Sequence, residues 1–283
     1  MSQDSVGLQL QHHREWLANN GDRIEQRELR YIEQEFADGS PQACLVLTDC
    51  LDGLATVYGV RGILDAADGS GDWESQVARA FDYWGWSLKI RAHACFVSPL
   101  VKRMNLTNHI SRAACLVCSS DAWAGIAGAV LRRAAAEPGA IDEKFWQRRR
   151  FEPFVLACLD FAENRRLESS GQLRDPYVGV LESISRIGGV PMEMMASMCD
   201  YQLMNISDSG RGRKPEFTDP PFDLLPCEIM IVNQLLEVTG RPHIKELDHR
   251  LVRLSGRTTR LGASKSADAL IDRVESFFES CYG

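Results

Sequence analysis

The sequence lacks the patterns from which β-strands are predicted. No extended alternation of apolar and polar residues occurs, and no Asn-Gly or Asp-Gly turn stands between two β-branched runs. Apolar residues recur instead at the three- and four-residue spacing of an amphipathic helix along almost the whole chain. These observations argue against a β or mixed fold, and the sequence predicts an all-α protein.

Long hydrophobic runs are also missing. The longest, such as residues 43–47 and 229–232, stop well short of the roughly 20 apolar residues that cross a bilayer. The N-terminal stretch MSQDSVGLQLQHHREW has neither the basic start nor the apolar core of a secretory signal. We therefore expect no membrane span and a cytoplasmic location.

The cysteines do not form the pattern of a disulfide framework. Their number is odd, they lie mostly inside apolar segments, and a chain of 283 residues can build a core without covalent staples. We interpret them as reduced core residues of a cytoplasmic protein. They are Cys44, Cys50, Cys95, Cys115, Cys118, Cys158, Cys199, Cys227 and Cys281.

Recognisable catalytic motifs are absent. The chain contains no phosphate-binding loop, dinucleotide fingerprint, nucleophile elbow or zinc-protease motif. Cys115 and Cys118 have the spacing of a metal or redox pair, but no second pair completes a zinc site, and their surroundings indicate a helix. Two buried cysteines on one helical face are the favoured interpretation.

A second candidate metal site is incomplete in the same way. His243, Glu246 and His249 lie three residues apart on a predicted helix and match half of the pattern found in carboxylate-bridged di-iron proteins. The second copy of the pattern is missing, so surface or capping histidines are favoured. The sequence therefore predicts no catalytic residue, no metal and no cofactor.

Charge is unevenly distributed. The formal net charge is −7, and residues 1–75 hold 5 Lys and Arg against 14 Asp and Glu, whereas residues 76–170 hold 14 against 9. An acidic face repels phosphate, which makes nucleic acid an unfavourable direct partner and a basic protein a suitable one.

The helical spacing predicts roughly eleven helices in a single domain, residues 1–283, arranged as a bundle or an irregular stack of antiparallel hairpins. Expected N-caps are Asp22, Asp72 or Ser70, Thr107 and Asp121. No repeat of fixed period occurs, which disfavours a regular solenoid. The predicted ranges are 22–37, 41–67, 73–96, 108–118, 122–136, 142–150, 153–168, 176–187, 191–206, 226–239, 243–255 and 265–281.

One long irregular segment precedes the C-terminal helices, at 207–225. Its sequence, SDSGRGRKPEFTDPPFDLL, is rich in glycine and proline and changes from basic to acidic. We expect either a flexible surface connection or a loop that contacts a partner. The apolar helix that follows reads as a buried helix rather than the wall of an active site.

Aromatic residues crowd the tract DYWGWSLKIRAHACF at 82–96. Tyr83, Trp84 and Trp86, with His93 further along the helix, could form a ligand pocket or an interface anchor, although core packing explains the same spacing. This tract is the basis of one alternative function, an α-helical enzyme or small-ligand sensor. A second alternative is a helical adaptor or scaffold with several partners.

The order of helices resembles that of all-helical immunity proteins, which bacteria pair with polymorphic toxins delivered by type VI secretion or contact-dependent systems. The features that carry the resemblance are the proline-led block DLLPCEIMIVNQLLEVTG with its short following helix, and the tryptophan-rich helix at 73–96. The pattern is similar to the immunity protein 49 family and covers residues 73–255 loosely. It implies a non-enzymatic protein that neutralises a toxin by covering its substrate site.

A nuclease-type toxin would be basic around its active site, so the acidic N-terminal quarter is the expected contact surface. Solvated carboxylates that only maintain solubility are the alternative reading of the same residues. Whether the free chain self-associates stays open. The predicted partner-binding residues are Glu33, Glu35, Asp38, Asp49, Asp52, Asp65, Asp68 and Asp72, followed by the loop residues Glu216, Asp219 and Asp223.

Overall fold

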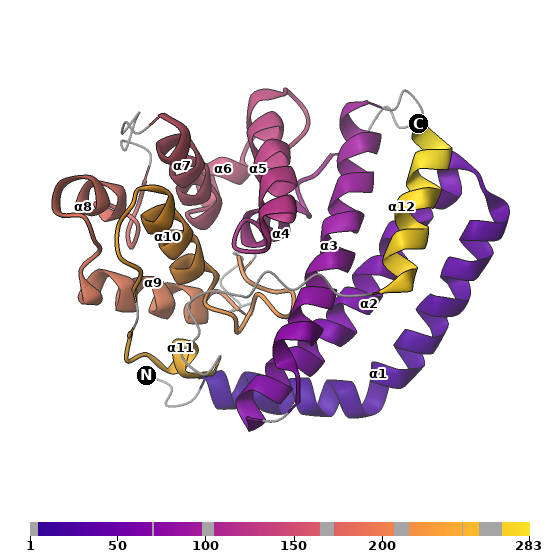
Figure 1. The fold of residues 1–283 in the computed structure, drawn as a ribbon, viewed down its shortest axis with the longest axis horizontal. Coiled ribbons are helices and arrows are strands. Elements are labelled where there is room, and N and C mark those ends of the chain that lie inside the picture. The colour runs from indigo at the N-terminus through magenta and orange to yellow at the C-terminus, as the bar shows by residue number, and fades with distance from the viewer. Residues whose placement is uncertain are drawn as a thin grey trace.

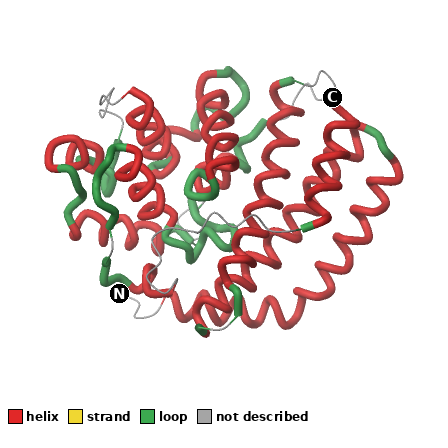
Figure 2. Tube along the Cα trace, viewed as in Figure 1, coloured by secondary structure: helices red, strands yellow, loops and turns green. Residues whose placement is uncertain are grey.

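The computed structural model describes residues 5–69, 71–97, 105–164, 173–206, 215–244, 246–254 and 268–283. Within these ranges the chain forms twelve α-helices and no strand (Figure 1, Figure 2), so the all-α prediction is confirmed. The helices are α1 Ser5–Asp38, α2 Pro41–Asp68, α3 Trp73–Phe96, α4 Ile110–Leu116, α5 Asp121–Ala136, α6 Phe145–Arg148, α7 Phe151–Asn164, α8 Val180–Ile187, α9 Met192–Met204, α10 Cys227–Val238, α11 Arg250–Leu254 and α12 Ala269–Tyr282.

The three long N-terminal helices form one side of the molecule, on the right in Figure 1. α1 packs along α2 and α2 along α3, and α12 lies against both α2 and α3. Shorter helices form the other side, where α4 and α5 contact α3 and α10 packs against α7 and α9. A continuous set of buried hydrophobic side chains runs through both sides, from Val6 in α1 to Phe277 in α12.

Local signals set the ends of the long helices. Ser40 caps α2, because its Oγ accepts a backbone N–H at 3.0 Å, and Pro41 occupies the first turn, where its missing N–H costs nothing. Gly69 ends the same helix at φ +62°, in the left-handed region. Asp72 caps α3 through a backbone N–H at 3.3 Å, in agreement with the prediction.

Three other predicted caps are wrong. Asp22 lies inside α1, which continues through it on both sides. Thr107 precedes α4 in a turn, where its Oγ accepts the backbone N–H of Asp142 at 2.9 Å. Asp121 is the first residue of α5 rather than its cap. Each residue type is common at helix N-termini, but this preference alone does not fix where a helix begins.

The proline-rich segment before α10 is buried. Residues 207–214 of the predicted loop lie outside the described residues, but the part that follows, residues 215–226, runs through the middle of the molecule and is called here the interior segment. The side chains of Phe217, Phe222, Leu224 and Leu225 are at most 1% exposed. For this half, the expectation of a flexible surface connection is wrong, because four large apolar side chains are more stable inside the core.

Close contacts hold the interior segment against the long helices. A Cβ added at Gly59 of α2 would lie 2.6 Å from the carbonyl group of Pro220, so the glycine permits this approach. The indole Nε1 of Trp84 in α3 donates to the same carbonyl oxygen at 3.0 Å. The rings of Phe81 and Phe222 stack with their centroids 5.3 Å apart.

The other side of the segment contacts α9 and α1. The side-chain amide of Gln202 donates to the carbonyl oxygens of Phe222 and Leu225, at 2.8 and 2.6 Å. The ring Nε2 of His13 lies 2.7 Å from a carboxylate oxygen of Asp223, and both side chains are buried. The interior segment therefore joins the two sides of the fold, and three of its buried carbonyl groups accept hydrogen bonds from side chains of α3 and α9.

Helix α2 is long and apolar enough to cross a membrane by length and composition alone. Its most apolar window, however, is 67% buried inside the protein. A helix that packs against α1, α3 and α12 reaches this hydropathy as the central helix of a helical core.

Candidate functional site

The predicted acidic contact residues divide between the two ends of α2. Asp65, Asp68 and Asp72 lie at or near its C-terminal end, whereas Glu33, Glu35 and Asp38 lie on the last turns of α1, next to its N-terminal end. A helix of 28 residues separates the two groups by roughly 40 Å. The acidic residues of positions 1–75 therefore do not form one continuous surface.

The group at the C-terminal end of α2 is largely engaged in local contacts. Asp72 caps α3, and Asp68 forms an ion pair with Arg14 of α1. Burial and the neighbouring Asp68 carboxylate raise the pKa of Asp65 above its ordinary value. Asp72 therefore fixes the start of α3, and Asp68 joins the end of α2 to α1.

Glu33 also has an internal partner. Both of its carboxylate oxygens accept from the guanidinium of Arg273 in α12, at 2.7 and 2.8 Å, and this bidentate hydrogen bond lowers the pKa of Glu33. The pair is exposed, so it contributes little to stability, although it shows that α12 lies beside the end of α1.

Three predicted residues remain on a second face shared by α1 and α2. Tyr31, Glu35 and Asp38 follow one another at helical spacing on α1, and Val46 and Asp49 lie one turn apart on α2. Tyr31 is 41% and Val46 48% exposed, Asp38 and Asp49 are exposed, and Glu35 is half-buried. We call these five residues the α1–α2 strip.

Electrostatic contacts with Cys50 place both halves of the strip together. Burial, together with the nearby carboxylates of Glu28, Glu35 and Asp49, raises the pKa of this thiol to about 12. Glu28 itself lies over Gly53 of α2, where an added Cβ would be 2.8 Å from its side chain. The two helices are therefore in close contact at Glu28 and Gly53, about one turn along each helix from Tyr31 and Asp49.

Asp49 and Asp52 lead from the strip into a buried charge network. Arg91 of α3 contacts Asp49 at 2.6 Å and Asp52 at 2.8 Å, while the hydroxyl of Ser87 donates to Asp52 at 2.5 Å. The Asp52 carboxylate also accepts from Arg112 of α4 at 3.0 Å. Burial alone would raise the pKa of Asp52, but the two guanidinium groups hold it below its ordinary value.

Arg112 connects the network to the interior segment. Its Nε donates to Asp219 at 3.0 Å, and its Cζ lies 3.6 Å from the centre of the Trp84 ring. Burial and the positive charges of Arg91 and Arg112 lower the pKa of His109 to about 4, so this imidazole is neutral at physiological pH. The network holds fixed, mutually paired charges, and the groups described in it suit a structural role better than proton transfer.

Two predicted contact residues are inside the protein. Glu216 is 2% exposed and accepts from the hydroxyl of Tyr201 at 2.8 Å and the backbone N–H of Phe151 at 3.0 Å. Asp223 is fully buried beside His13. Neither carboxylate reaches the surface, so neither can contact a partner protein. The third predicted residue of this segment, Asp219, forms an ion pair with Arg112.

A wide cleft of about 1090 Å³ opens next to this network, between the turn before α4, the region around α6 and the interior segment. Lys144, Arg148 and Arg149 line it together with Asp142, Glu143 and Asp219. Charges of both signs are present in equal number, so the lining shows no preference for an anion or a cation.

The aromatic tract is part of the core. Tyr83, Trp84 and Trp86 are at most 4% exposed, and a Cβ added at Gly85 would lie 2.3 Å from the ring of Trp123. None of these three aromatic residues lines the cleft described above or the groove described below. Core packing therefore explains the spacing of these aromatic residues.

His93 packs against the C-terminal helix. The centre of its ring lies 4.3 Å from that of Tyr282 and 5.5 Å from that of Phe278, and burial lowers its pKa. These contacts anchor α12 against α3, which gives the histidine a packing role.

The two candidate metal patterns have different outcomes. Cys115 and Cys118 are buried and free, as expected for core thiols. His243 and His249 do not share a helix, because the described chain is irregular until α11 begins at residue 250, and they approach Glu237 and Asp200 separately. Among the described residues no group of three or more metal-ligating side chains could hold an ion.

A buried carboxyl group, that of Glu228, lies in the first turn of α10. The hydroxyl of Tyr177 donates to Glu228, and burial raises the pKa of Glu228 well above its ordinary value. The other carboxylate oxygen of Glu228 has no hydrogen-bond partner among the described residues. The side chain is therefore most stable in its protonated, neutral form.

Replacing this carboxyl with an amide should change the pH dependence of stability. Because the folded pKa is raised, the Glu228 contribution is fully present below the unfolded pKa and is lost as pH rises toward the folded value. We expect Glu228→Gln to unfold at a higher temperature than the wild type above pH 5, with a free-energy difference that grows by up to about 1.4 kcal/mol per pH unit. Thermal unfolding at several pH values measures this.

The matched control is Glu182→Gln, because Glu182 is an exposed carboxylate paired with Arg186 on α8. This variant should follow the wild-type pH dependence closely. If the difference in unfolding temperature from the wild type depends on pH equally in both variants, Glu228 is ionised in the folded protein and the interpretation of this site is wrong.

Comparison with known proteins adds no relative. No protein-family model, curated protein or solved structure matches this chain. The residues and their geometry therefore carry the functional argument.

Proposed function

We propose that this chain is a cytoplasmic, non-enzymatic immunity protein, which neutralises a secreted toxin by binding it stoichiometrically and covering its substrate site. The proposal follows the resemblance of the sequence to helical immunity proteins. The observation that carries it is the α1–α2 strip, in which the exposed Tyr31 and Val46 share two helices with three carboxylates. The guanidinium of Arg30 also lies 5.5 Å from the centre of the Tyr31 ring.

This arrangement has the composition of a protein-binding surface. Tyrosine is enriched at the energetically dominant positions of interfaces, and charged residues are typical of the rim. Tyr31 and Val46 would supply the apolar centre, and Glu35, Asp38 and Asp49 the acidic rim. Such a rim favours a basic partner, because complementary potentials raise the association rate and exclude other acidic proteins.

The strip is also rigid. It lies on two helices in contact through Glu28 and Gly53, and Asp49 is fixed by Arg91. A surface that is already ordered before binding loses little conformational entropy in the complex, which raises affinity for the same contacts. A nuclease-type effector, whose active site must be basic to hold phosphates, is the class of toxin that fits this surface.

The test compares charge reversal at the two ends of α2. The strip variant is Tyr31→Ala with Glu35→Lys, and the control variant is Asp65→Lys with Asp68→Lys, which reverses more charge at the other end. Tagged wild-type protein captures its partner from native lysate, mass spectrometry identifies it, and the purified partner is then used for binding kinetics and for inhibition of its activity.

We expect one stoichiometric, basic partner that associates more slowly as salt rises. The strip variant should bind it at least about 30-fold more weakly, as for loss of an interface hot spot, and should fail to inhibit it at wild-type concentrations. The control should change the dissociation constant by less than about threefold. Loss of binding in the control with an unaffected strip variant would overturn the assignment.

A further inference from the structure

Two of the nine cysteines are only partly covered by the fold. Cys95 in α3 and Cys281 in α12 are half-buried, whereas the other seven are buried. Susceptibility of a thiol to oxidation follows its exposure as well as its thiolate character. An oxidant in solution therefore reaches Cys95 and Cys281 before the other cysteines.

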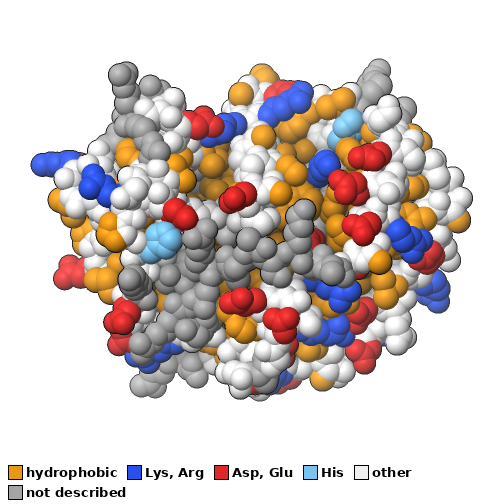
Figure 3. All heavy atoms as spheres, in the orientation of Figure 1, with side chains coloured by type: hydrophobic (Ala, Val, Ile, Leu, Met, Phe, Trp, Pro, Cys, Tyr) orange, Lys and Arg blue, Asp and Glu red, His pale blue; other side chains and the backbone are white. Residues whose placement is uncertain are grey.

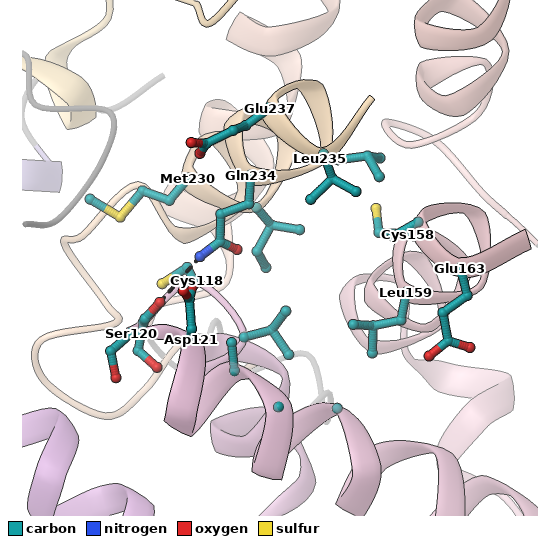
Figure 4. A pocket seen from close by; sticks show the side chains of 18 of the residues that line it. Cys118, Ser120, Asp121, Cys158, Leu159, Glu163, Met230, Gln234, Leu235 and Glu237 are labelled. Atoms are coloured by element: carbon teal, nitrogen blue, oxygen red, sulfur yellow. Dashed lines mark hydrogen bonds between the residues drawn. The ribbon is translucent and has the colours of Figure 1, made fainter. Parts of the chain in front are cut away.

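The groove between α5, α7 and α10 does not expose a further pair of thiols. Its volume is about 610 Å³, and Cys118 and Cys158 are among the residues that line it. Figure 3 shows hydrophobic side chains in the hollow between α7 and α5, with carboxylates at its edge. In Figure 4 the two cysteines lie on opposite sides of the open space, and each is 3% exposed. Burial also raises the pKa of the Cys158 thiol, which keeps this sulfur protonated and unreactive.

Cys281 lies against the turn between α1 and α2. Its Sγ donates to the carbonyl oxygens of Ser40 at 3.6 Å and Gly39 at 3.9 Å. The hydroxyl of the next residue, Tyr282, donates to the carbonyl oxygen of Pro41 at 2.9 Å. Three consecutive carbonyl groups thus accept hydrogen bonds from the last turn of α12, and Figure 1 shows this end of α12 beside the start of α2.

The same turn brings Cys281 to Cys44, in the first turn of α2. The backbone N–H of Cys44 donates to the carbonyl oxygen of Ser40 at 3.1 Å, so it shares this acceptor with the Cys281 thiol. Burial raises the pKa of the Cys44 thiol to about 12, and the charge of Cys281 and a hydrogen bond with it contribute to the rise. The two side chains are therefore in contact.

We propose that Cys44 and Cys281 form a reversible disulfide when the protein meets hydrogen peroxide, and that this bond fastens α12 to the start of α2. The Cys281 sulfur attacks one oxygen of the peroxide, and the O–O bond breaks. The departing hydroxide takes the thiol proton and becomes water, which leaves Cys281 as a sulfenic acid.

The second step closes the disulfide. The Cys44 sulfur attacks the Cys281 sulfur, the S–O bond breaks, and the hydroxyl group leaves with the Cys44 thiol proton as a second water. Two electrons have then passed from the two sulfurs to the peroxide. A dithiol reductant reverses the reaction by thiol–disulfide exchange.

Burial fixes the order of these steps. Cys281 is half-buried and meets the peroxide, whereas Cys44 is 0% exposed and reacts second. Oxidation of Cys281 also removes its thiolate charge and its thiol hydrogen bond, two of the causes that raise the pKa of Cys44, which favours the second step. Reversible disulfides of this kind are the usual form in reducing compartments. The site does not depend on the proposed toxin binding.

The test begins with the reduced, full-length protein at neutral pH. The protein is treated with hydrogen peroxide, alkylated and separated on a non-reducing gel, and the monomer band is digested for mass spectrometry. We expect one linked peptide pair that contains Cys44 and Cys281 and disappears after treatment with dithiothreitol. The oxidised protein should melt at least about 4 °C above the reduced protein, because the closed loop restricts the unfolded chain.

Three variants assign the bond. Cys281→Ser should keep the helical circular dichroism spectrum and lose both the linked peptide and the rise in melting temperature. Cys44→Ala should stop at the sulfenic acid of Cys281, which dimedone labels. The matched control is Cys95→Ser, because Cys95 is the other half-buried thiol, and this variant should keep the linked peptide and the rise in melting temperature.

Three results would overturn the proposal. The first is an oxidised wild-type monomer without the peptide that links Cys44 and Cys281. The second is a disulfide of Cys281 that appears only between two chains, which would show that it pairs with a second copy. The third is an equal rise in melting temperature in Cys281→Ser, which would place the stabilising oxidation at another residue.

Discussion

Replacing Arg112 with methionine should lower the free energy of unfolding by about 3–5 kcal/mol. The guanidinium lies between Asp52 and Asp219 and stacks on Trp84, so it joins α2, α3, α4 and the interior segment at one point. Methionine keeps much of the apolar volume but leaves Asp219 without its cation and Asp52 with Arg91 alone. An uncompensated carboxylate in a partly buried position is the main cost.

Urea unfolding followed by circular dichroism measures this change. The control is Arg186→Met, because Arg186 forms an exposed pair with Glu182 one turn away on α8 and should change stability by less than about 0.5 kcal/mol. Equal unfolding midpoints for the two variants would show that the network contributes no more than a surface ion pair.

Truncating Phe222 to alanine should destabilise the protein by about 3–5 kcal/mol, as for other fully buried aromatic residues. The ring is 1% exposed and stacks on Phe81 of α3. The control is Thr218→Ala in the same segment, because Thr218 is exposed. If both variants unfold at the same urea concentration, the interior segment is not a packing element of the core.

Much of the fold follows from helical periodicity and local caps. The boundaries of α2 and α3 are predictable because Ser40, Gly69 and Asp72 carry the chemistry of helix ends. α1 is longer than predicted. Local preference alone would begin a helix at Asp22, but packing along α2 keeps the chain helical at Gly21 and Asp22 as well. Tertiary contacts override propensity at such positions.

The interior segment shows why composition can mislead. Its prolines and carboxylates are typical of a surface connection or of a loop that contacts a partner, and both predictions place it at the surface. The signal that could have identified it is the density of large apolar residues, Phe217, Phe222, Leu224 and Leu225, within nine positions. Such a density is costly to leave exposed, whatever the backbone conformation.

The partners of the acidic residues could not be predicted. Glu33 pairs with Arg273, 240 residues away, and Asp52 with Arg112, 60 residues away. The numbers of charged residues along the chain do not reveal either pair, because the partners come close only when their helices pack together. The charge count of the sequence therefore describes composition alone, and only the fold shows that Glu33, Asp49 and Asp52 are paired while Asp38 is exposed at the end of α1.

Hydrogen–deuterium exchange on the protein with and without its captured partner tests the central claim most directly. The account predicts that binding slows exchange in residues 29–50, which contain the α1–α2 strip, and leaves residues 61–75 at the other end of α2 unchanged. Protection confined to residues 61–75, or to the groove between α5, α7 and α10, would contradict it.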